Sequence, residues 1–359
     1  MISSGIPHIK MPGSQRGWAA YAEPVDSGLL FFAGIMKAIV YRRYGSPDVL
    51  SLEEVPQPVP KDNEVLVKVH AASINDWDWG TLQGKPFVNR LLNGLFKPRH
   101  RILGGDIAGQ VEAVGDNVEQ LQAGDEVFGD LSASGWGAFA EYVCAPEDAL
   151  ALKPAALTFE EVAALPQAAL LALQGLRDYA NVQSGQRVLI NGAGGGAGTF
   201  AVQIAKASGA EVTGVDSTGK LDVMRSIGAD EVIDYTREDF TKNGRQYDLI
   251  LDLAAHHSIF DYRRALRPNG IYVMVGCASA RIIQVMLLGP LISMVGSKKL
   301  GILAYKTNQG LTRLAELLQS RTIVPVIDRQ YPLSEVADAL RYFGAGHAKG
   351  KVIITMDHG

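Results

Sequence analysis

The fold is most strongly constrained by a glycine-rich turn near the middle of the chain. Residues 187–199 read RVLINGAGGGAGT, so an apolar strand-like run meets five glycines within seven positions and then a helix-like stretch. Such a turn lets backbone N–H groups approach a pyrophosphate, and the helix that follows directs its positive end toward the same group. We therefore predict a dinucleotide site on this turn, formed by Gly192, Gly194, Gly195, Gly196, Ala197 and Gly198.

An acidic residue closes the next predicted strand, residues 211–215. Asp216 stands 18 residues beyond Gly198, where a carboxylate would face the adenosine ribose of a dinucleotide. A carboxylate there favours NADH, because it accepts both ribose hydroxyls and repels a 2′-phosphate. Ser217 and Lys220 follow at once and favour a phosphate, so these residues alone leave the cofactor choice open.

The pattern of predicted secondary structure differs on the two sides of Pro154. After it, helices alternate with strands expected at 187–191, 211–215, 231–233, 248–252, 271–275 and 299–304, which is typical of a doubly wound parallel sheet. Before it, short runs rich in Val, Ile and Ala lie between Gly, Pro and Asp turns and indicate a compact β barrel. The expected fold class is α/β, a Rossmann sheet plus a β-rich domain.

The length of 359 residues exceeds what one hydrophobic core usually holds, so we expect two domains. A β-rich catalytic domain is assigned to 36–153 and 322–359, because a last strand at 351–355 should return to the first part. A Rossmann dinucleotide-binding domain is assigned to 154–321. Residues 1–35 lack the pattern of a secretory signal and are expected to be a disordered extension.

Composition excludes several classes of protein. With 34 basic and 38 acidic residues the chain has a net charge of −4, so nucleic acid is not expected as a partner. The two cysteines, Cys144 and Cys277, are too few for a disulfide framework or a four-cysteine zinc site, and they fit a cytoplasmic setting. The apolar runs 28–35 and 282–295 are shorter than the about 20 residues of a membrane-spanning helix.

From residue 36 onward the chain resembles the medium-chain dehydrogenase/reductase superfamily, and within it the zinc-free quinone oxidoreductase-like branch. The resemblance rests on the glycine turn and on LGGDIAG at 103–109, GAFAEY at 137–142 and SIGADEVIDY at 226–235. It implies a GroES-like catalytic domain beside the Rossmann domain. It also implies reduction of a small-molecule quinone or α,β-unsaturated carbonyl by hydride from a nicotinamide cofactor.

The resemblance also bears on metal binding. Zinc-dependent members of the superfamily place a cysteine at the position of Asn75 and a histidine at that of Gly105, and neither residue here can bind zinc. We therefore expect no metal. Without a Lewis acid, hydride transfer depends on positioning and hydrogen bonds, which favours acceptors whose developing charge is already delocalised.

Asn75 and Asp78, within SINDWDW at 73–79, match the pocket asparagine and aspartate of the branch. We expect Asn75 to donate a hydrogen bond to the acceptor oxygen and Asp78 to orient water or a loop amide. The alternative is a polar turn after the strand at 64–72, in which both side chains satisfy backbone groups.

The resemblance favours NADPH, with NADH also accepted, because Lys220 and Tyr235 match the positions that hold the 2′-phosphate in NADPH-dependent members. The nicotinamide is expected at the carboxyl end of strand 271–275, a place formed by Val275, Gly276 and Cys277.

Two other functions stay open: a zinc-free alcohol dehydrogenase or enoyl-thioester reductase, and a cofactor-binding protein without turnover. The resemblance points to a homodimer. The apolar run 282–295 beside an expected edge strand at 271–275 supports self-association, since both would otherwise be exposed.

Overall fold

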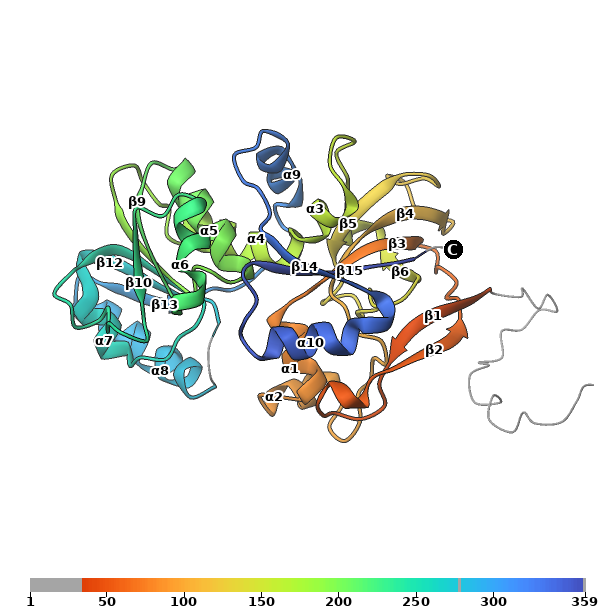
Figure 1. The fold of residues 1–359 in the computed structure, drawn as a ribbon, viewed down its shortest axis with the longest axis horizontal. Coiled ribbons are helices and arrows are strands. Elements are labelled where there is room, and N and C mark those ends of the chain that lie inside the picture. The colour runs from red at the N-terminus through yellow and green to blue at the C-terminus, as the bar shows by residue number, and fades with distance from the viewer. Residues whose placement is uncertain (1–33, 277–278, 358–359) are drawn as a thin grey trace, which may run out of the picture. The chain divides into compact units, whose positions relative to one another are not determined.

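The computed structural model describes residues 34–276 and 279–357, and the expected extension at 1–35 therefore lies almost entirely outside the described residues (Figure 1). The described chain opens with a two-stranded antiparallel ribbon, β1 (Ile35–Val40) and β2 (Ser51–Pro56). Among the described residues, no helix combines the length and the apolar composition of a membrane span.

A largely antiparallel sheet of seven strands forms the β-rich part. Its order is β14-β15-β3-β4-β5-β7, and β6 pairs with β3. Val65, Val67, Val69 and Ile107 of the two longest strands are buried in its core. The strands are β3 (Glu64–Ile74), β4 (Asp106–Val114), β5 (Glu126–Asp130), β6 (Tyr142–Pro146), β7 (Leu150–Leu152), β14 (Ile327–Pro332) and β15 (Lys351–Thr355).

A six-stranded parallel sheet forms the second part, in the order β10-β9-β8-β11-β12-β13. This confirms the expected α/β fold class with a Rossmann-type sheet. The predicted and observed bounds of β8 coincide at Arg187–Asn191. The other strands are β9 (Glu211–Asp216), β10 (Glu231–Asp234), β11 (Tyr247–Asp252), β12 (Leu266–Met274) and β13 (Lys299–Ile302).

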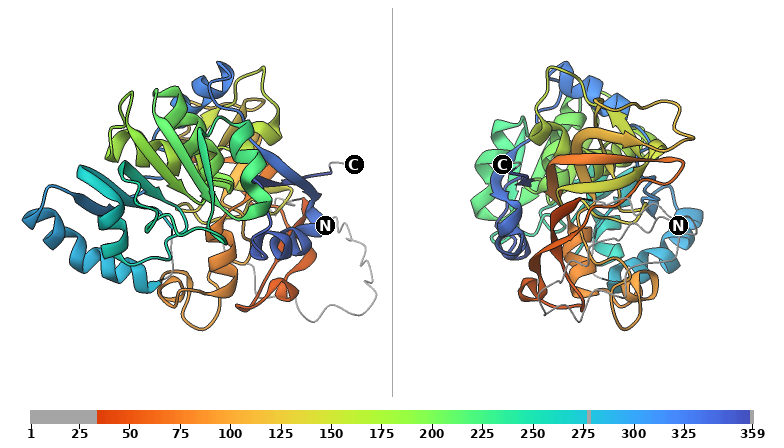
Figure 2. Two further views of the ribbon diagram at one scale, coloured as in Figure 1. Left: turned by 60° about the vertical axis from the view of Figure 1, so that its left-hand side comes forward. Right: turned by 90° about the vertical axis from the view of Figure 1, so that its right-hand side faces the viewer.

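Helices cover both faces of the parallel sheet (Figure 2). On one face Val188 and Leu251 share a core with α4 (Pro166–Leu173), α5 (Gly196–Ala207) and α9 (Leu311–Gln319). On the other face Leu189 and Ile250 pack with α7 (Ile259–Ala265) and α8 (Ser279–Val295). The alternation of these neighbouring residues between two cores explains why the strands read as continuous apolar runs.

The prediction that the strand at 271–275 lies at the edge of the sheet is wrong. Strand β12 lies between β11 and β13, so Lys299–Ile302 is the outermost strand on that side of the sheet. A continuous apolar run is typical of an inner strand, and the short β13 with two lysines before Leu300 has the character of an edge. Helix α8 nevertheless exposes apolar side chains, as expected for 282–295.

Three features join the two sheets. Strand β15 pairs antiparallel with β3 within the β-rich sheet, as expected for the tail, and Gly350 N, just before β15, donates across to Gly194 O over 3.1 Å. The Tyr305 hydroxyl donates to Asp130 Oδ2 over 2.9 Å. The Asn308 side chain makes a two-way pair with the Asp130 backbone, at 2.8 and 2.9 Å.

The remaining helices are short. Helix α3 (Phe159–Ala163) begins in a capping box, in which the Thr158 side chain accepts from Glu161 N over 3.2 Å. The other short helices are α1 (Asp76–Gln83), α2 (Val88–Asn93), α6 (Leu221–Ser226) and α10 (Val336–Gly344).

Candidate active site

A cleft of about 740 Å³ runs along the carboxyl ends of the parallel strands and is closed by the β-rich part. From the Rossmann part it is lined by Asn191, Gly192, Gly195, Gly196, Ala197, Gly198, Asp216, Ser217, Lys220, Tyr235, Val275 and Gly276. From the β-rich part it is lined by Ile74, Asn75, Asp76, Trp77, Gly350 and Lys351. Cys277 lies outside the described residues.

The glycine turn has the shape that a pyrophosphate requires. Gly192 has φ +85°, a backbone conformation that side chains disfavour. A Cβ at Gly198 would lie 2.0 Å from Gly192 O, so this glycine lets α5 pack against β8. A Cβ at Gly195 would meet only Gly192 O, at 3.4 Å, and would fill the cradle itself. The N-terminus of α5 faces this cradle, so the residues present fit the pyrophosphate of a dinucleotide.

Gly194 differs from its neighbours because the structure does not place it on the cleft wall. Its N–H donates to Asp216 Oδ2 over 3.0 Å, and its carbonyl accepts from Gly350 N. Asp216 Oδ1 also accepts from Ser217 N over 2.8 Å and lies 3.7 Å from Lys220 Nζ. The Asp216 carboxylate is therefore already bonded within the protein, which reduces what it can offer to ribose hydroxyls.

A second, basic cavity of about 380 Å³ shares Ser217 and Lys220 with the cleft. Three more basic side chains line it: Arg329, His347 and Lys349. The Arg329 guanidinium lies over the Tyr342 ring at 4.0 Å. The lining carboxylate Asp328 accepts from the Tyr342 hydroxyl and from Lys349 N, at 2.6 and 3.0 Å. This cavity suits a dianionic phosphate.

Asn75 is held between a buried ammonium and a buried carboxylate. Lys351 Nζ donates to Asn75 Oδ1 over 2.6 Å and to Ile74 O over 3.2 Å. Asn75 Nδ2 donates to Asp106 Oδ2 over 2.8 Å. An ammonium only donates and a carboxylate only accepts, so these partners determine which end of the amide is oxygen. The second N–H of Asn75 stays available to the cleft that this residue lines.

Lys351 and Asp106 form a fully buried ion pair, with Nζ 3.5 Å from Oδ2. Burial lowers the pKa of Lys351 and raises that of Asp106, and the attraction between the two charges opposes both shifts. Asp106 also accepts from the Ser73 hydroxyl over 2.9 Å and from Gln167 N over 3.0 Å. A buried charge of this kind is stable only when it is paired and hydrogen-bonded, as it is here.

Asp78, expected among the catalytic residues, is not among the residues that line the cleft. Its side chain is fully buried and accepts from Asn75 N over 2.8 Å and from Gly104 N over 3.1 Å. Asp78 therefore caps α1 and orients a loop amide, the second of the roles expected for it. Burial, the largest cause, raises the pKa of Asp78 to about 7.

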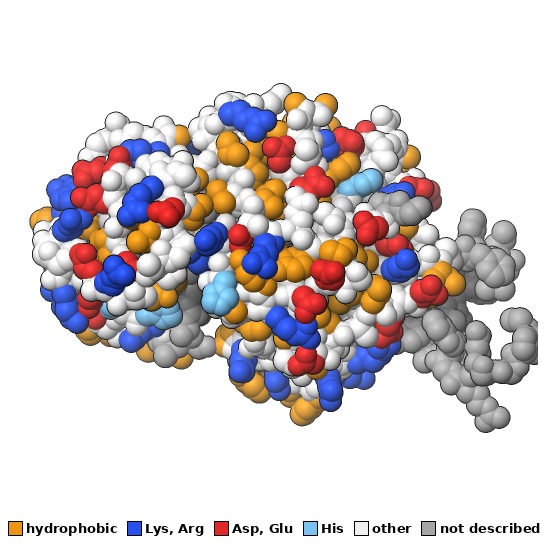
Figure 3. Space-filling view, viewed as in Figure 1, with side chains coloured by type: hydrophobic (Ala, Val, Ile, Leu, Met, Phe, Trp, Pro, Cys, Tyr) orange, Lys and Arg blue, Asp and Glu red, His pale blue; other side chains and the backbone are white. Residues whose placement is uncertain are grey.

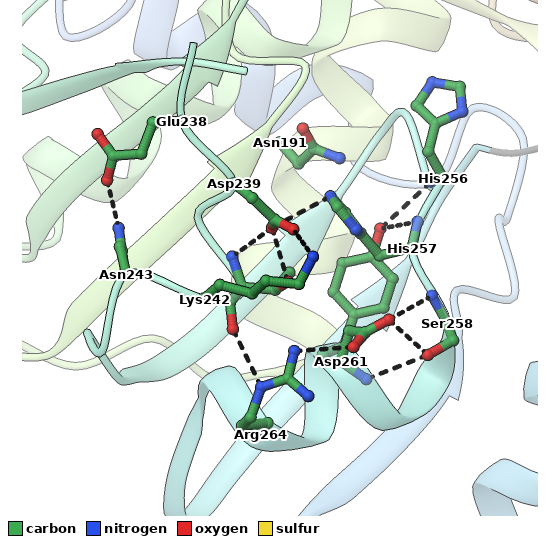
Figure 4. A network of polar contacts seen from close by, with 12 residues as sticks. Asn191, Glu238, Asp239, Lys242, Asn243, His256, His257, Ser258, Asp261 and Arg264 are labelled. Carbon is green, nitrogen blue, oxygen red and sulfur yellow. Dashed lines mark hydrogen bonds and ion pairs between the residues drawn. The ribbon is translucent and has the colours of Figure 1, made fainter. Parts of the chain in front are cut away.

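A polar network supports the cleft wall beyond Asp216, where the loops after β10 and β11 meet (Figure 4). Asp239 accepts from Lys242 Nζ over 2.9 Å and faces His257 Nε2 at 3.8 Å. The Tyr262 hydroxyl accepts from His256 N and His257 N, at 3.3 and 3.4 Å. Both histidines line the cleft, so the loop after β11 is part of the site.

Lys351 and the second cavity were missed by reasoning from the sequence. A lysine at the start of a strand is ordinarily exposed, so GKVIIT at 350–355 carries no sign of a buried ammonium. The available signal was the expected return of that strand to the β-rich part, which brings Lys351 beside Asn75.

Within the described residues, no group of three or more His, Cys, Asp or Glu could hold a metal ion.

Two families match separate stretches of the chain. Residues 61–155 match the alcohol dehydrogenase GroES-like domain, and residues 227–354 match the family described as zinc-binding dehydrogenase. The chain is 35% identical to a 2-methylene-furan-3-one reductase of Solanum lycopersicum, over 89% of this chain and 79% of that protein.

Two further relatives cover most of the chain. An NADPH-dependent alkenal/one oxidoreductase, chloroplastic, of Arabidopsis thaliana is 32% identical, over 89% of this chain and 79% of that protein. The solved structure of the quinone oxidoreductase from Coxiella burnetii superposes with a TM-score of 0.81 at 32% identity, over 90% of this chain and all of that one.

Proposed function

This chain belongs to the medium-chain dehydrogenase/reductase superfamily, in its zinc-free quinone oxidoreductase-like branch, and we propose how its cleft carries out the reaction of that branch. It is an oxidoreductase that reduces quinones or α,β-unsaturated carbonyls with NADPH, and NADH is also accepted. The observation that carries the proposal is the meeting of the glycine cradle with the Asn75 amide in one cleft.

The cleft would hold the cofactor along the carboxyl ends of the strands. Gly195, Gly196 and the first N–H groups of α5 would hold the pyrophosphate, and Val275 and Gly276 would adjoin the nicotinamide. Lys220 and Ser217 receive the 2′-phosphate, with Tyr235 beside them on the cleft wall and Arg329, His347 and Lys349 lining the adjoining basic cavity. When bound, the cofactor supplies the hydride.

The acceptor lies next to Asn75, whose free N–H donates to the oxygen on which negative charge develops. Lys351 and Asp106 hold the amide in that orientation, so little reorganisation is needed as charge builds up. A preorganised donor of this kind stabilises the developing negative charge, as a metal would, on an acceptor that already delocalises it. The Lys351 ammonium faces Ile74 O, Asn75 Oδ1 and Asp106 Oδ2, so we assign the proton that completes the reaction to solvent.

A steady-state screen tests this function. Quinones, enones, enoyl thioesters, aldehydes and alcohols are compared with NADPH and NADH, before and after exhaustive chelation with elemental analysis. We expect turnover of quinones or enones that survives chelation. The proposed function is contradicted if alcohols are the preferred substrates, if only enoyl thioesters are turned over, or if the protein binds cofactor without turnover. It is also contradicted if the protein contains stoichiometric zinc whose removal abolishes activity.

Three finer proposals accompany the function. The protein acts in the cytoplasm and forms a homodimer through the β13 edge and the exposed apolar side of α8. The β-rich catalytic part comprises 36–153 and 322–359, and the Rossmann part comprises 154–321. The joining of β15 to β3 supports the assignment of the tail to the catalytic part.

A further inference from the structure

The segment 85–101, which follows α1 and contains α2, has an unusual charge distribution. It carries Lys85, Arg90, Lys97, Arg99 and Arg101, and no Asp or Glu occurs between Asp78 and Asp106. The chain as a whole has more acidic than basic residues, so this region is positive within a negative protein. Lys85, Lys97, Arg99 and Arg101 are exposed.

Large apolar side chains protrude from the same segment. Phe96 is 89% exposed, Phe87 and Leu91 are each 62% exposed, and Leu95 is 40% exposed. In Figure 3, basic and hydrophobic side chains occur together along the lower rim, over the region of α1 and α2 in Figure 1. Exposure of apolar side chains to water is unfavourable, and a cluster of exposed apolar side chains on one segment marks an interaction surface.

The segment is held in place by the β-rich part. The Tyr44 hydroxyl donates to Gly94 O over 2.6 Å. The Arg90 guanidinium lies over the Tyr44 ring at 4.9 Å, and its Nε donates to Gly84 O over 3.2 Å. The exposed side chains therefore stand on an anchored platform.

We propose that segment 85–101 docks the protein on the surface of an anionic lipid bilayer. Phe87, Leu91, Leu95 and Phe96 enter the headgroup region, and the surrounding Lys and Arg side chains contact the lipid phosphates. Apolar side chains surrounded by cations are the usual pattern of interfacial binding, because burial and electrostatic attraction then act together.

A second copy of this chain suits the segment less well. In a two-fold dimer the same patch meets itself, so five cations would face five cations without an intervening carboxylate from the segment. Nucleic acid would satisfy the cations and leave the protruding Phe and Leu side chains in water. An anionic bilayer would neutralise the cations and also bury the Phe and Leu side chains.

Docking would also bring the cleft close to lipid. Asp76, the first residue of α1, lines the cleft, and the eight residues of α1 span about 12 Å before the segment begins. A lipophilic acceptor dissolved in the bilayer would then be about one short helix away from Asn75.

Flotation of the full chain with vesicles tests the proposal. The probes are phosphatidylcholine vesicles with and without phosphatidylglycerol, at low and high salt. We expect binding only with phosphatidylglycerol, and weakening by salt, because exposed charges are screened over about 10 Å at 0.1 M. Lys97→Glu combined with Arg99→Glu should lower the partition coefficient by roughly 25-fold or more, at about fivefold per charge removed. Phe96→Asp should lower it as well.

Control variants carry single changes of the same kinds outside the segment. Lys61→Glu alters an exposed lysine and Val59→Asp alters an exposed apolar residue, both outside the segment, and both should bind vesicles as the parent does. Turnover of a water-soluble quinone should be unchanged in every variant, which shows that the cleft is intact. The proposal is overturned if the parent ignores phosphatidylglycerol, if the segment variants bind like the controls, or if Phe96→Asp changes the sedimentation coefficient, which would assign the patch to self-association.

Discussion

At the scale of single residues, the acceptor end of the cleft depends on the orientation of one amide. Asn75 is 6% exposed and has Lys351 on its oxygen and Asp106 on its nitrogen. Reversing the amide would place a donor against the ammonium and an acceptor against the carboxylate. Lys351 and Asp106 together therefore hold the Asn75 amide in one orientation, and they do so without a metal.

Replacement of Asn75 by alanine tests this role. We expect Asn75→Ala to lower kcat for an enone by about 10²-fold, the usual cost of removing one donor to a developing oxyanion. The Kd of NADPH, measured by fluorescence titration, should stay within a few-fold. Asn75 also precedes α1, so Thr158→Ala, which removes the cap of α3 outside the cleft, is the control and should leave kcat unchanged. Equal losses in both variants would assign Asn75 a structural role only.

The cofactor preference should depend on the basic cavity. Removing a charged hydrogen-bond partner costs about 1.5–3 kcal/mol, so Lys220→Ala or Arg329→Ala should raise the Kd of NADPH by roughly 10- to 100-fold and leave that of NADH little changed. Lys61→Ala, at an exposed lysine far along the chain, is the control. An NADH-preferring parent that is indifferent to the loss of Lys220 would show that Asp216 governs the choice.

Asp78 should make stability depend on pH. Its pKa is raised to about 7, whereas an unfolded aspartate titrates near 4, so between these values the native chain holds a proton that the unfolded chain has released. The contribution of this group to the free energy of unfolding must then fall as pH rises from about 4 to about 7, and stay constant above that. Asp78→Asn lacks this titration.

Denaturant unfolding at about pH 4.5 and about pH 7.5 measures this effect. The free energy of unfolding of the parent minus that of Asp78→Asn should be smaller at the higher pH, by roughly 1.4 kcal/mol per pH unit within the window. A difference that does not change with pH would show that Asp78 titrates normally in the folded protein.

At the scale of elements, the glycine turn combines two tasks that substitutions can separate. Gly198 lets α5 pack on β8, because a Cβ there would collide with Gly192 O, while Gly195 keeps the cradle open. We expect Gly198→Ala to lower the free energy of unfolding by about 1–3 kcal/mol through overpacking. Gly195→Val should leave the melting temperature nearly unchanged and abolish NADPH binding in a titration. Normal NADPH binding by folded Gly195→Val would place the pyrophosphate elsewhere.

At the scale of the whole molecule, the exposed side of α8 predicts the assembly. Met286, Leu287 and Leu291 are exposed on this helix, and Ser293 Oγ ties it to the edge strand by accepting from Leu300 N over 3.1 Å. We expect a dimer in sedimentation velocity at micromolar concentration. Leu287→Asp should shift it toward monomer by burying an unpaired charge at the interface. Phe96→Asp is the control and should stay dimeric, and a monomeric parent would contradict the assignment.

The sequence by itself determined the parts that depend on neighbours within a few residues. The cap of α3 depends on Thr158 and Glu161, three positions apart, and the turn at Gly192 depends on the freedom of glycine. Strand β8 follows from strand patterning, and its bounds were predicted in place. The order of β12 and β13 was not, because the neighbour of a strand is decided by how the chain crosses the sheet.

Only the tertiary structure decided where the buried charges lie. Asn75 and Lys351 are 276 positions apart, and Asp106 joins them from β4. Each residue alone looks like a surface polar group, because burial of a charge is tolerated only when its partners are already assembled around it. The same reason placed Asp78 under the cleft wall rather than on it, since its two N–H partners come from α1 and from the loop at Gly104.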